Sequence, residues 1–463
     1  MFNAKKGDSA DKSRSESREL IAIDIGTFTI RIGVGFVHRD GQVEMTYYSE
    51  VPSRGMVGGS VANLSDLASA LSELSQRFNE ESGYDLNNAA CIIGIAGRHI
   101  DSFNSRGNAT IMGGVVSTTD RRKAIDNACT VRYKDNHHLI HGIPRDFQAD
   151  SIQGITDPVG LSTPRIEVLV HLITCSVDQE KNLRAAIAKM NPRTSVKQVI
   201  FNGIAAADAV LVESEKDIGV AVVDMGEGTV NVTVYDRKQL IISFGLAFGG
   251  DRMRREIAQQ FGVSLNEAED LKYDAYAARD LIPEEKRQGY FQVTVKDSYG
   301  NVSGQIRVPL YELVGIVEDN LVDIFRAVRD RIEEAVKDAV RDDPALSNSG
   351  LNLGAGFVLT GGLSRIPGIS YVASHALSNS PNGPVSVRLG APRGVSLSAP
   401  EVDPDNRLSL SDAACVVGLL RCAGLDRDLR QKETDAAMGR KQHSGLIGSF
   451  TDRIRNWWKR EFL

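Results

Sequence analysis

The sequence contains the same strand–turn–strand pattern twice, and in each copy an aspartate stands where the first strand ends. One copy is VAVVDMGEGTVNVTVYD (220–236), in which Val220–Val223 and Val230–Tyr235 have the apolar run and the alternation of strands. The other copy is LIAIDIGTFTIRIGV (20–34). A repeat of this kind predicts an α/β protein with two duplicated halves facing a shared cleft.

The turn residues of both copies indicate phosphate binding. A tight Gly/Thr turn exposes consecutive backbone N–H groups, and such a nest binds anions. Asp24 and Asp224 would repel phosphate unless a cation lay between, and Mg²⁺ prefers waters, one or two carboxylates and phosphate oxygens. We therefore predict that the two turns grip the β- and γ-phosphates, with Mg²⁺ between Asp24 and Asp224. The alternative is a pair of ordinary hairpins with acidic turns.

A third glycine motif, FVLTGGLS, occupies 357–364. A strand that ends in Gly361–Gly362 lets a flat ring approach the backbone, since no Cβ intrudes. One such motif is weak by itself, but after two phosphate-type hairpins it favours a nucleotide site.

The composition is that of an ordinary soluble globular protein, with 42% hydrophobic and 25% charged residues. The net charge of −6 argues against a general nucleic-acid binder. Residues 1–18 are polar and lack the apolar region of a signal peptide, so we expect a disordered leader. No run reaches the ~18 apolar residues of a membrane span, and a cytoplasmic location is expected.

The cysteines are scattered and include no C-x-x-C pair, and the histidines form no metal-spaced cluster beyond His137–His138. We expect buried reduced thiols rather than a disulfide framework or a zinc site. The cysteines are Cys91, Cys129, Cys175, Cys415 and Cys422.

The three glycine motifs together resemble the actin-like ATPase superfamily, and the finer resemblance is to the FtsA family of bacterial cell-division proteins. The resemblance implies an actin-like fold around a nucleotide cleft, with an inserted subdomain IC and a C-terminal amphipathic helix. The matching segments run across nearly the whole body: VPSRGMVGG (51–59), IAGRHI (95–100), DPVGLS (157–162), VHLITC (170–175) and RLGAP (388–392).

The resemblance also implies a division into four subdomains between a leader and a tail. The expected boundaries are 1–18 for the leader, 19–101 and 178–213 for IA, 102–177 for IC, 214–247 and 319–424 for IIA, 248–318 for IIB, 425–443 for a linker, and 444–463 for a membrane-targeting helix.

ATP and Mg²⁺ binding follow from the same resemblance. Glu227 and Asn231 stand where the family has glycine and aspartate, and an extra carboxylate would weaken nucleotide binding unless it points outward. Glu269 and Lys272 match positions that contact the ribose and base; their alternative is a solvated i,i+3 pair. Gly249–Gly250 lie at a helix start, which favours phosphate. The expected nucleotide-binding residues are Asp24, Gly26, Thr27, Thr29, Asp224, Gly226, Gly228, Thr229, Gly249, Gly250, Glu269, Lys272, Gly361, Gly362 and Leu363, with Asp24 and Asp224 holding Mg²⁺ through water.

Hydrolysis depends on the residue that faces the attacking water. Asn202 stands near the position of the catalytic-water glutamate of DnaK-type proteins. An amide orients a water but cannot take its proton, so we expect ATP binding with slow or undetectable turnover.

The resemblance further implies polymerisation of the protein with itself, recruitment of the tubulin-like protein FtsZ through its C-terminal peptide, and recruitment of later division proteins. The FtsZ contact is expected in IIB. The helix entering IIA often carries a basic residue in the family, whereas this chain has Glu318–Asp319. The alternative is a solvated basic surface. The candidates are Arg279, Lys286, Arg287 and Arg307.

The last twenty residues, SGLIGSFTDRIRNWWKREFL, predict an in-plane helix on the anionic cytoplasmic face of the inner membrane, at the division site. On a helical projection the apolar side chains share one arc, Arg453 and Arg455 lie at its edges, and Lys459 and Arg460 lie on the polar side. The alternative is a helix that docks onto the body or a partner. The apolar residues are Leu446, Ile447, Phe450, Ile454, Trp457, Trp458 and Phe462.

Two functions from different classes remain at this point. The first is a membrane-tethering, filament-forming scaffold that uses ATP as a conformational cofactor. The second is an actin-like ATPase or kinase, such as a PilM-like pilus-assembly protein or a sugar kinase. The insertion and the amphipathic tail favour the scaffold.

Overall fold

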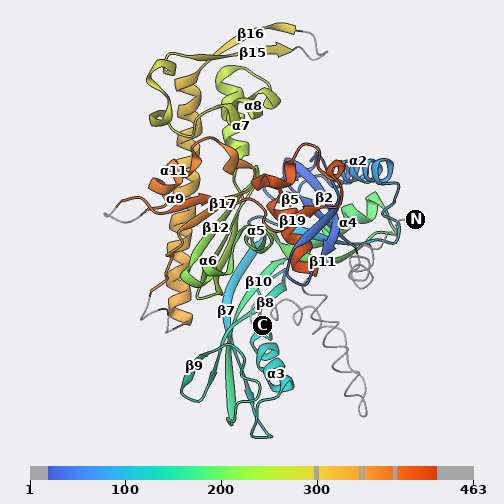
Figure 1. The fold of residues 1–463 in the computed structure, drawn as a ribbon, viewed down its shortest axis with the longest axis vertical. Helices are drawn as coiled ribbons and strands as arrows, with labels where there is room; N and C mark the ends of the chain where they lie inside the picture. The colour runs from blue at the N-terminus through green and yellow to red at the C-terminus, as the bar shows by residue number, and fades with distance from the viewer. Residues whose placement is uncertain (1–18, 297–301, 344–345, 347–349, 379–382, 425–463) are drawn as a thin grey trace, which may run out of the picture.

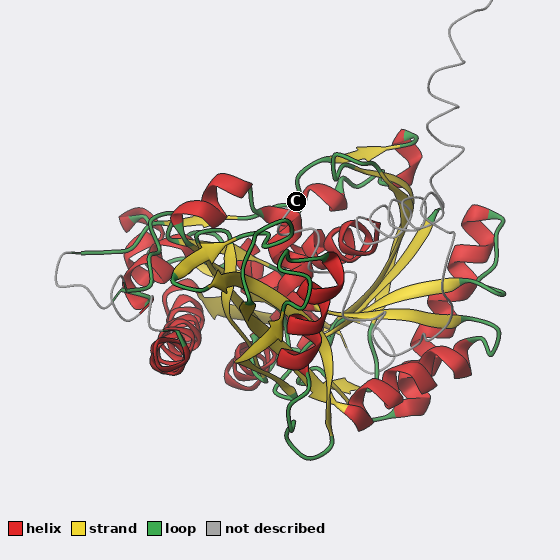
Figure 2. Ribbon diagram, turned by 90° about the horizontal axis from the view of Figure 1, so that it is seen from below, coloured by secondary structure: helices red, strands yellow, loops and turns green. Residues whose placement is uncertain are grey.

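The computed structural model describes residues 19–296, 302–343, 346, 350–378 and 383–424. The expected leader (1–18), linker (425–443) and membrane helix (444–463) lie outside the described residues. Two sheet-containing halves lie next to each other, with a strand-rich subdomain at one end and a helix–hairpin region at the other (Figure 1). Seen from below, most helices lie outside the strands (Figure 2).

The first half is built on a sheet of six strands. Strand β1 pairs antiparallel with β2 and parallel with β6. Helix α2 (Leu64–Ser82) buries Leu67, Leu71, Leu74 and Phe78 in the core of this half, which is the face that its 3.6-residue periodicity predicts. The strand order is β11 (Ser195–Phe201), β6 (Ala90–Ile95), β1 (Leu20–Ile25), β2 (Thr29–Val37), β3 (Val43–Pro52), β19 (Val395–Leu397).

The second half repeats this arrangement with five strands. Strand β12 pairs antiparallel with β13 and parallel with β17, as β1 does with β2 and β6. The predicted duplication is therefore confirmed. The order is β14 (Gln239–Leu246), β13 (Val230–Asp236), β12 (Val220–Met225), β17 (Phe357–Thr360), β18 (Val387–Leu389).

The inserted strands form a separate sheet below the first half in Figure 1. This region also contacts the second half: the His171 ring lies 2.8 Å from Ser243 Oγ, and Arg145 donates to Asp343 at 2.7 Å. The elements are β7 (Ile100–Thr110), α3 (Thr118–Cys129), β8 (His137–Ala149), β9 (Ile152–Ile155) and β10 (Arg165–Ser176), followed by α4 (Val177–Met190).

The region at the opposite end comprises two helices and a hairpin. Helix α8 (Leu265–Asp274) begins with a capping box, because Ser264 and Glu267 bond each other's backbone N–H groups. The long helix α9 (Leu310–Asp342) runs from this region along the second half (Figure 1). The other elements are α7 (Gly250–Phe261), α8 (Leu265–Asp274), β15 (Tyr290–Lys296) and β16 (Val302–Pro309).

The end of the described chain departs from the expected boundary of IIA. Strand β19 pairs with β3 of the first sheet, and residues 414–424 form a helix that buries Val416 and Leu420 in the first core. The helix comes so close to α5 (Asn202–Val210) that an added Cβ on Gly418 would collide with the carbonyl of Ala205. Residues 395–397 and 414–424, expected in IIA, therefore pack with the first half.

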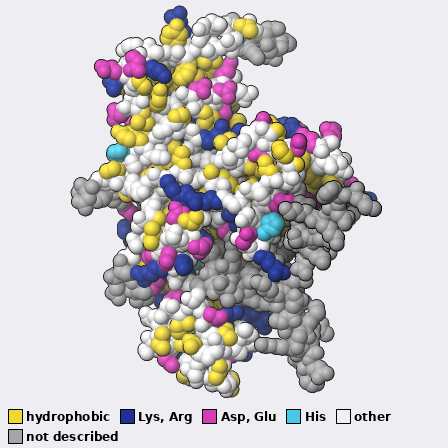
Figure 3. All heavy atoms as spheres, in the orientation of Figure 1, with side chains coloured by type: hydrophobic (Ala, Val, Ile, Leu, Met, Phe, Trp, Pro, Cys, Tyr) yellow, Lys and Arg dark blue, Asp and Glu magenta, His cyan; other side chains and the backbone are white. Residues whose placement is uncertain are grey.

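Charged side chains of both signs and apolar side chains are interspersed on the face shown in Figure 3. No helix in the part of the chain that the structure describes is long and apolar enough to span a bilayer.

Candidate nucleotide-binding site

The two predicted hairpin turns meet in the structure. An added Cβ on Gly228 would collide with the hydroxyl of Thr27, so the second turn fits against the first only because residue 228 is glycine. The turns also close in the same way: Gly26 N donates to Thr29 O at 3.1 Å, and Gly226 N donates to Thr229 O at 2.8 Å. One turn from each half therefore faces the same place.

Asp24 ends β1 at this junction and is 5% exposed. Asn202 at the start of α5 donates to its carboxylate at 3.1 Å, and Arg31 lies 4.0 Å away across the hairpin. Burial raises the pKa of Asp24, an effect that Arg31 and Asn202 offset only in part. The side chain is a desolvated carboxylate that favours a further cation.

Asp224 occupies the equivalent position at the end of β12. Asn231 donates to it at 3.0 Å and the Cys415 thiol lies 3.5 Å away. Burial raises its pKa to about 6, and the negative charge of Asp24 adds to the shift. The charge of Asp24 therefore disfavours ionisation of Asp224, and a cation near both carboxylates would relieve that repulsion.

Two buried acceptors accompany the carboxylates. The side-chain oxygens of Asn202 and Asn231 have no hydrogen-bond partner, although each amide nitrogen donates to an aspartate. Carboxylates together with carbonyl-type acceptors suit Mg²⁺, which keeps several waters when it binds proteins. The donor set thus fits a hydrated magnesium ion.

Glu227 points inward and joins a buried charge cluster. Lys272 is fully buried and donates to Glu227 at 2.8 Å and to Glu269 at 2.7 Å. Arg254 Nε lies 2.9 Å from the other Glu227 oxygen, without the alignment of a hydrogen bond. Burial raises the pKa of Glu227, and Lys272 opposes that shift. The solvated-pair alternative for Glu269 and Lys272 is therefore wrong.

The start of α7 supports the second turn. Gly250 N donates to Gly226 O at 3.2 Å, and Asp251 N donates to Glu227 O at 2.8 Å. The helix start at Gly249–Gly250 is expected to favour phosphate, but in this structure the amides of Gly250 and Asp251 are bonded to the second turn. These bonds hold the backbone of that turn in place.

The third glycine motif lies against the second hairpin. Gly361 adopts φ +83°, and an added Cβ there would lie 2.7 Å from Asp224 Oδ1. Leu363 is buried and approaches Gly250, whereas Gly362 faces the Tyr273 hydroxyl. The structure thus brings together the residues predicted to bind nucleotide, from both hairpins, α7, α8 and this motif.

Sequence reasoning missed three side chains of this site. Arg31 lies opposite Asp24 in the pairing of β1 with β2. The register of this hairpin is the sequence signal that would have pointed to Arg31. Arg254 and Cys415 reach the site from α7 and from the helix at 414–424. No local pattern links either of them to the hairpins.

The four basic candidates for partner binding follow α8 in the chain: Arg279 and Lys286 lie in the short 3-10 helices at 279–281 and 284–286, Arg287 caps the second of these, and Arg307 lies in β16. Arg279 is held by Glu318 at 3.0 Å and by Asp319 at 3.7 Å. The other three, Lys286, Arg287 and Arg307, are exposed. The membrane-binding candidates at 446–462 lie outside the described residues.

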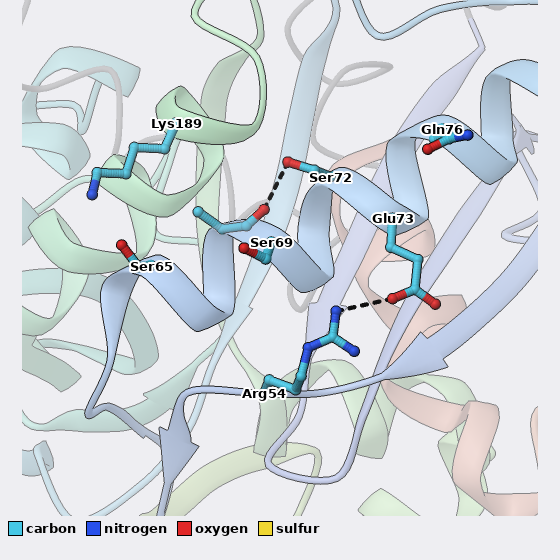
Figure 4. A pocket seen from close by; sticks show the side chains of 8 residues that line it. Arg54, Ser65, Ser69, Ser72, Glu73, Gln76 and Lys189 are labelled. Carbon is cyan, nitrogen blue, oxygen red and sulfur yellow. Dashed lines mark hydrogen bonds and ion pairs between the residues drawn. The ribbon is translucent and has the colours of Figure 1, made fainter.

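A polar cavity of about 530 Å³ lies between α2 and α4 (Figure 4). Arg54 and Glu73 pair across it at 2.9 Å. It contains none of the residues expected to bind nucleotide. Its lining residues are Arg54, Ser65, Ala68, Ser69, Ser72, Glu73, Gln76 and Lys189.

Comparison with known proteins gives two matches to family models. Residues 97–174 match the family described as "SHS2 domain inserted in FTSA", and residues 221–417 match "Cell division protein FtsA". The first overlaps the expected insertion, and together they take in more than half of the chain.

Curated relatives cover almost the full length. The cell division protein FtsA of Escherichia coli (strain K12) is 28% identical over 455 residues, 97% of this chain and 99% of that protein. The cell division protein FtsA of Pseudomonas aeruginosa is 26% identical over 383 residues, 83% of this chain and 85% of that protein. The length covered by these matches agrees with the resemblance described above, whose matching segments run across nearly the whole body of the chain.

A solved structure shares the fold. The chain superposes on one in the "PilM-PilN type IV pilus biogenesis complex" with a TM-score of 0.57 and 13% identity, covering 87% of this chain and 97% of that one. The predicted actin-like fold is confirmed.

Proposed function

Because the chain belongs to the FtsA family of cell-division proteins, we propose that it is an ATP-binding, actin-like scaffold that tethers the FtsZ ring to the membrane. The observation that carries the nucleotide part is the contact between the turns at Thr27 and Gly228, with Asp24 and Asp224 buried beside it. A turn from each half lets one ligand hold both halves together.

The residues on either side of this contact have distinct roles toward Mg-ATP. Asp24 and Asp224 hold Mg²⁺ through its waters, and the two turns bind the phosphates. Gly361–Leu363 accept the adenine, and Glu269 and Lys272 reach the ribose and base. The magnesium ion, when bound, neutralises charge that the two buried carboxylates and the phosphates would otherwise place together.

Hydrolysis is proposed to be slow or undetectable. Asn202 donates to Asp24 and is 7% exposed. Its amide can orient a water molecule but cannot accept a proton from it. ATP then acts as a ligand that selects one arrangement of the two halves.

Membrane attachment and partner binding complete the proposal. The amphipathic segment 444–463 binds the cytoplasmic face of the inner membrane at the division site, and the exposed basic residues of IIB bind the C-terminal peptide of FtsZ. Filament formation on the membrane multiplies both contacts along the assembly and recruits later division proteins.

Co-sedimentation with anionic liposomes, with and without ATP and FtsZ, tests this function. We expect the full chain to sediment with the lipid and to bring FtsZ with it. Trp457→Glu with Trp458→Glu should release the protein from lipid without changing ATP affinity, because the apolar face is lost. The matched control is Trp457→Phe with Trp458→Phe, which keeps that face.

Two results would contradict the proposal. Unchanged lipid binding by the double glutamate variant would remove the tail as the anchor. Sustained phosphorylation of a sugar or another small molecule would favour a kinase instead.

A further inference from the structure

Three side chains with metal-ligating atoms meet where the inserted sheet joins the first half. His138 Nε2 lies 2.5 Å from Glu180 Oε2, and Cys175 Sγ lies 3.9 Å from each of these two atoms. They come from β8, from the end of β10 and from the first turn of α4. No metal-binding spacing connects them in the sequence, because they stand on three separate elements.

The spacing of the three atoms is close to that of a zinc site. With Zn–N and Zn–O near 2.0 Å and Zn–S near 2.3 Å, tetrahedral ligand atoms lie about 3.3–3.6 Å apart. The sulfur distances of 3.9 Å exceed this range by a few tenths of an ångström, and the His138–Glu180 distance of 2.5 Å falls short of it. Small rotations of these side chains bring all three onto one ion.

The surroundings support a metal ligand at Glu180. Arg184 binds its other oxygen at 2.6 Å, which orients the carboxylate and leaves Oε2 turned toward His138 and Cys175. Ligating carboxylates commonly have such an outer partner. Cys175 and Glu180 are buried, whereas the His138 side chain is 32% exposed and gives an ion a route from solvent.

We propose that His138, Cys175 and Glu180 bind a zinc ion, with water as the fourth ligand, and that this ion fastens the inserted subdomain to α4 of the first half. Thiolate, imidazole and carboxylate together suit Zn²⁺, whereas Mg²⁺ and Ca²⁺ require oxygen ligands. When zinc binds, the Cys175 thiol releases its proton to solvent and the sulfur–zinc bond forms. The site is separate from Asp24 and Asp224.

In this structure the His138 ring and the Glu180 carboxylate pair directly, at 2.5 Å between Nε2 and Oε2. Zinc binding would replace this pair with a metal bridge between the inserted sheet and α4.

The test uses untagged full-length protein, freed of metal by a chelator and of nucleotide, and titrated calorimetrically with Zn²⁺. We expect one ion per chain. Cys175→Ser and His138→Gln should lower the affinity by more than about 100-fold, beyond what loss of an outer partner costs. Cys129→Ser, which changes another buried cysteine of the inserted subdomain, should bind zinc as the parent does.

Cobalt supplies a spectroscopic readout. Co²⁺ should give the sulfur-to-metal charge-transfer band of a thiolate ligand in the parent and none in Cys175→Ser. Zinc should also raise the melting temperature of the parent protein but not that of His138→Gln. Because the His138 side chain is partly exposed, its replacement is not expected to prevent folding.

The proposal is overturned if the parent binds no zinc, or if Cys175→Ser binds it equally well. It is also overturned if Asp224→Asn abolishes zinc binding, because the ion would then lie at the nucleotide site.

Discussion

Lys272 Nζ lies 2.8 Å from Glu227 Oε2, and the lysine side chain has no exposed surface. The glutamate belongs to the second phosphate-type turn, and Gly250 lies so close that an added Cβ would collide with the Glu227 carboxylate. A residue of the turn therefore supplies a negative charge to Lys272 and Arg254, the same two cations that an anionic ligand in this site would attract.

Glu227→Gln should tighten ATP binding. The amide no longer neutralises Lys272 and Arg254, so the bound nucleotide gains what amounts to one charged hydrogen bond. We expect an affinity increase of about tenfold, equivalent to about 1.4 kcal/mol, by calorimetry. The free energy of unfolding of the nucleotide-free protein, measured in urea, should fall by about 1–3 kcal/mol, because the buried Lys272 loses one of its carboxylate partners. Glu80→Gln, on the exposed side of α2, is the matched control, and a weaker affinity in Glu227→Gln would reverse the interpretation.

Asp224→Asn should stabilise the nucleotide-free protein while removing Mg-dependent ATP binding. Burial raises the pKa of Asp224 to about 6 from an ordinary 3.8. The folded state therefore loses stability as pH rises from about 4 through 6, and at pH 7 the ionised group costs about 3 kcal/mol. A neutral asparagine avoids that cost, so urea unfolding at pH 7 should show a gain that vanishes near pH 4. Asp135→Asn, at a 95% exposed side chain, should change neither property. Lower stability of Asp224→Asn at pH 7 would contradict the burial argument.

Acid should destabilise the protein through two buried histidines. Burial lowers the pKa of His141 and of His171 to about 3, from 6.5. The unfolded chain takes up these protons below pH 6.5 and the folded chain does not, so stability falls as pH falls from 6.5 toward 3. Each histidine contributes a slope of about 1.4 kcal/mol per pH unit in this window.

Replacing His171 isolates one of these contributions. His171→Gln should make the acid limb of the stability–pH curve shallower, whereas His375→Gln, at an exposed ring, should leave the slope unchanged. Because His171 bridges Asn104 and Ser243, its replacement should also lower stability at pH 7. An unchanged acid slope would show that His171 is protonated in the folded state.

Charge reversal at Lys286 and Arg287 should weaken binding of the FtsZ C-terminal peptide more than Arg279→Ala does. Arg279 is held by Glu318 and Asp319 and lies over the Tyr311 ring, so its charge is largely satisfied within the chain. We expect at least about a fivefold loss for Lys286→Glu with Arg287→Glu, or about 1 kcal/mol, and a steep salt dependence. Fluorescence anisotropy with labelled peptide measures both variants. Equal losses, or none in the double variant, would place the contact elsewhere.

Local pattern predicted the hairpins and helices well because their signals lie within a few residues. The expected strands at Val220–Val223 and Val230–Tyr235 are observed as Val220–Met225 and Val230–Asp236. The apolar face of α2 and the capping box at Ser264 likewise follow from residues only three or four positions apart. The repeated strand–turn–strand unit also predicted that Asp24 and Asp224 face one cleft, and the two carboxylates lie close enough for the charge of Asp24 to raise the pKa of Asp224.

Features that depend on distant partners could not be predicted in this way. The inward orientation of Glu227 depends on Lys272 and Arg254, which reach it from α8 and α7. The meeting of His138 with Cys175 likewise depends on how β8 and β10 pair. Strand β19 has only three residues, too few to show any periodicity.

The pairing of β19 with β3 has a consequence for the order in which the chain folds. The second sheet is made entirely of residues between Val220 and Leu389, so all its strands precede β19 in the chain. The first sheet cannot be completed until later, because its edge strand β19 and the helix that places Val416 against Gly33 come at the end of the described chain. Closing so long a loop costs chain entropy and slows folding, so we expect the edge of the first sheet to form after the second sheet is complete.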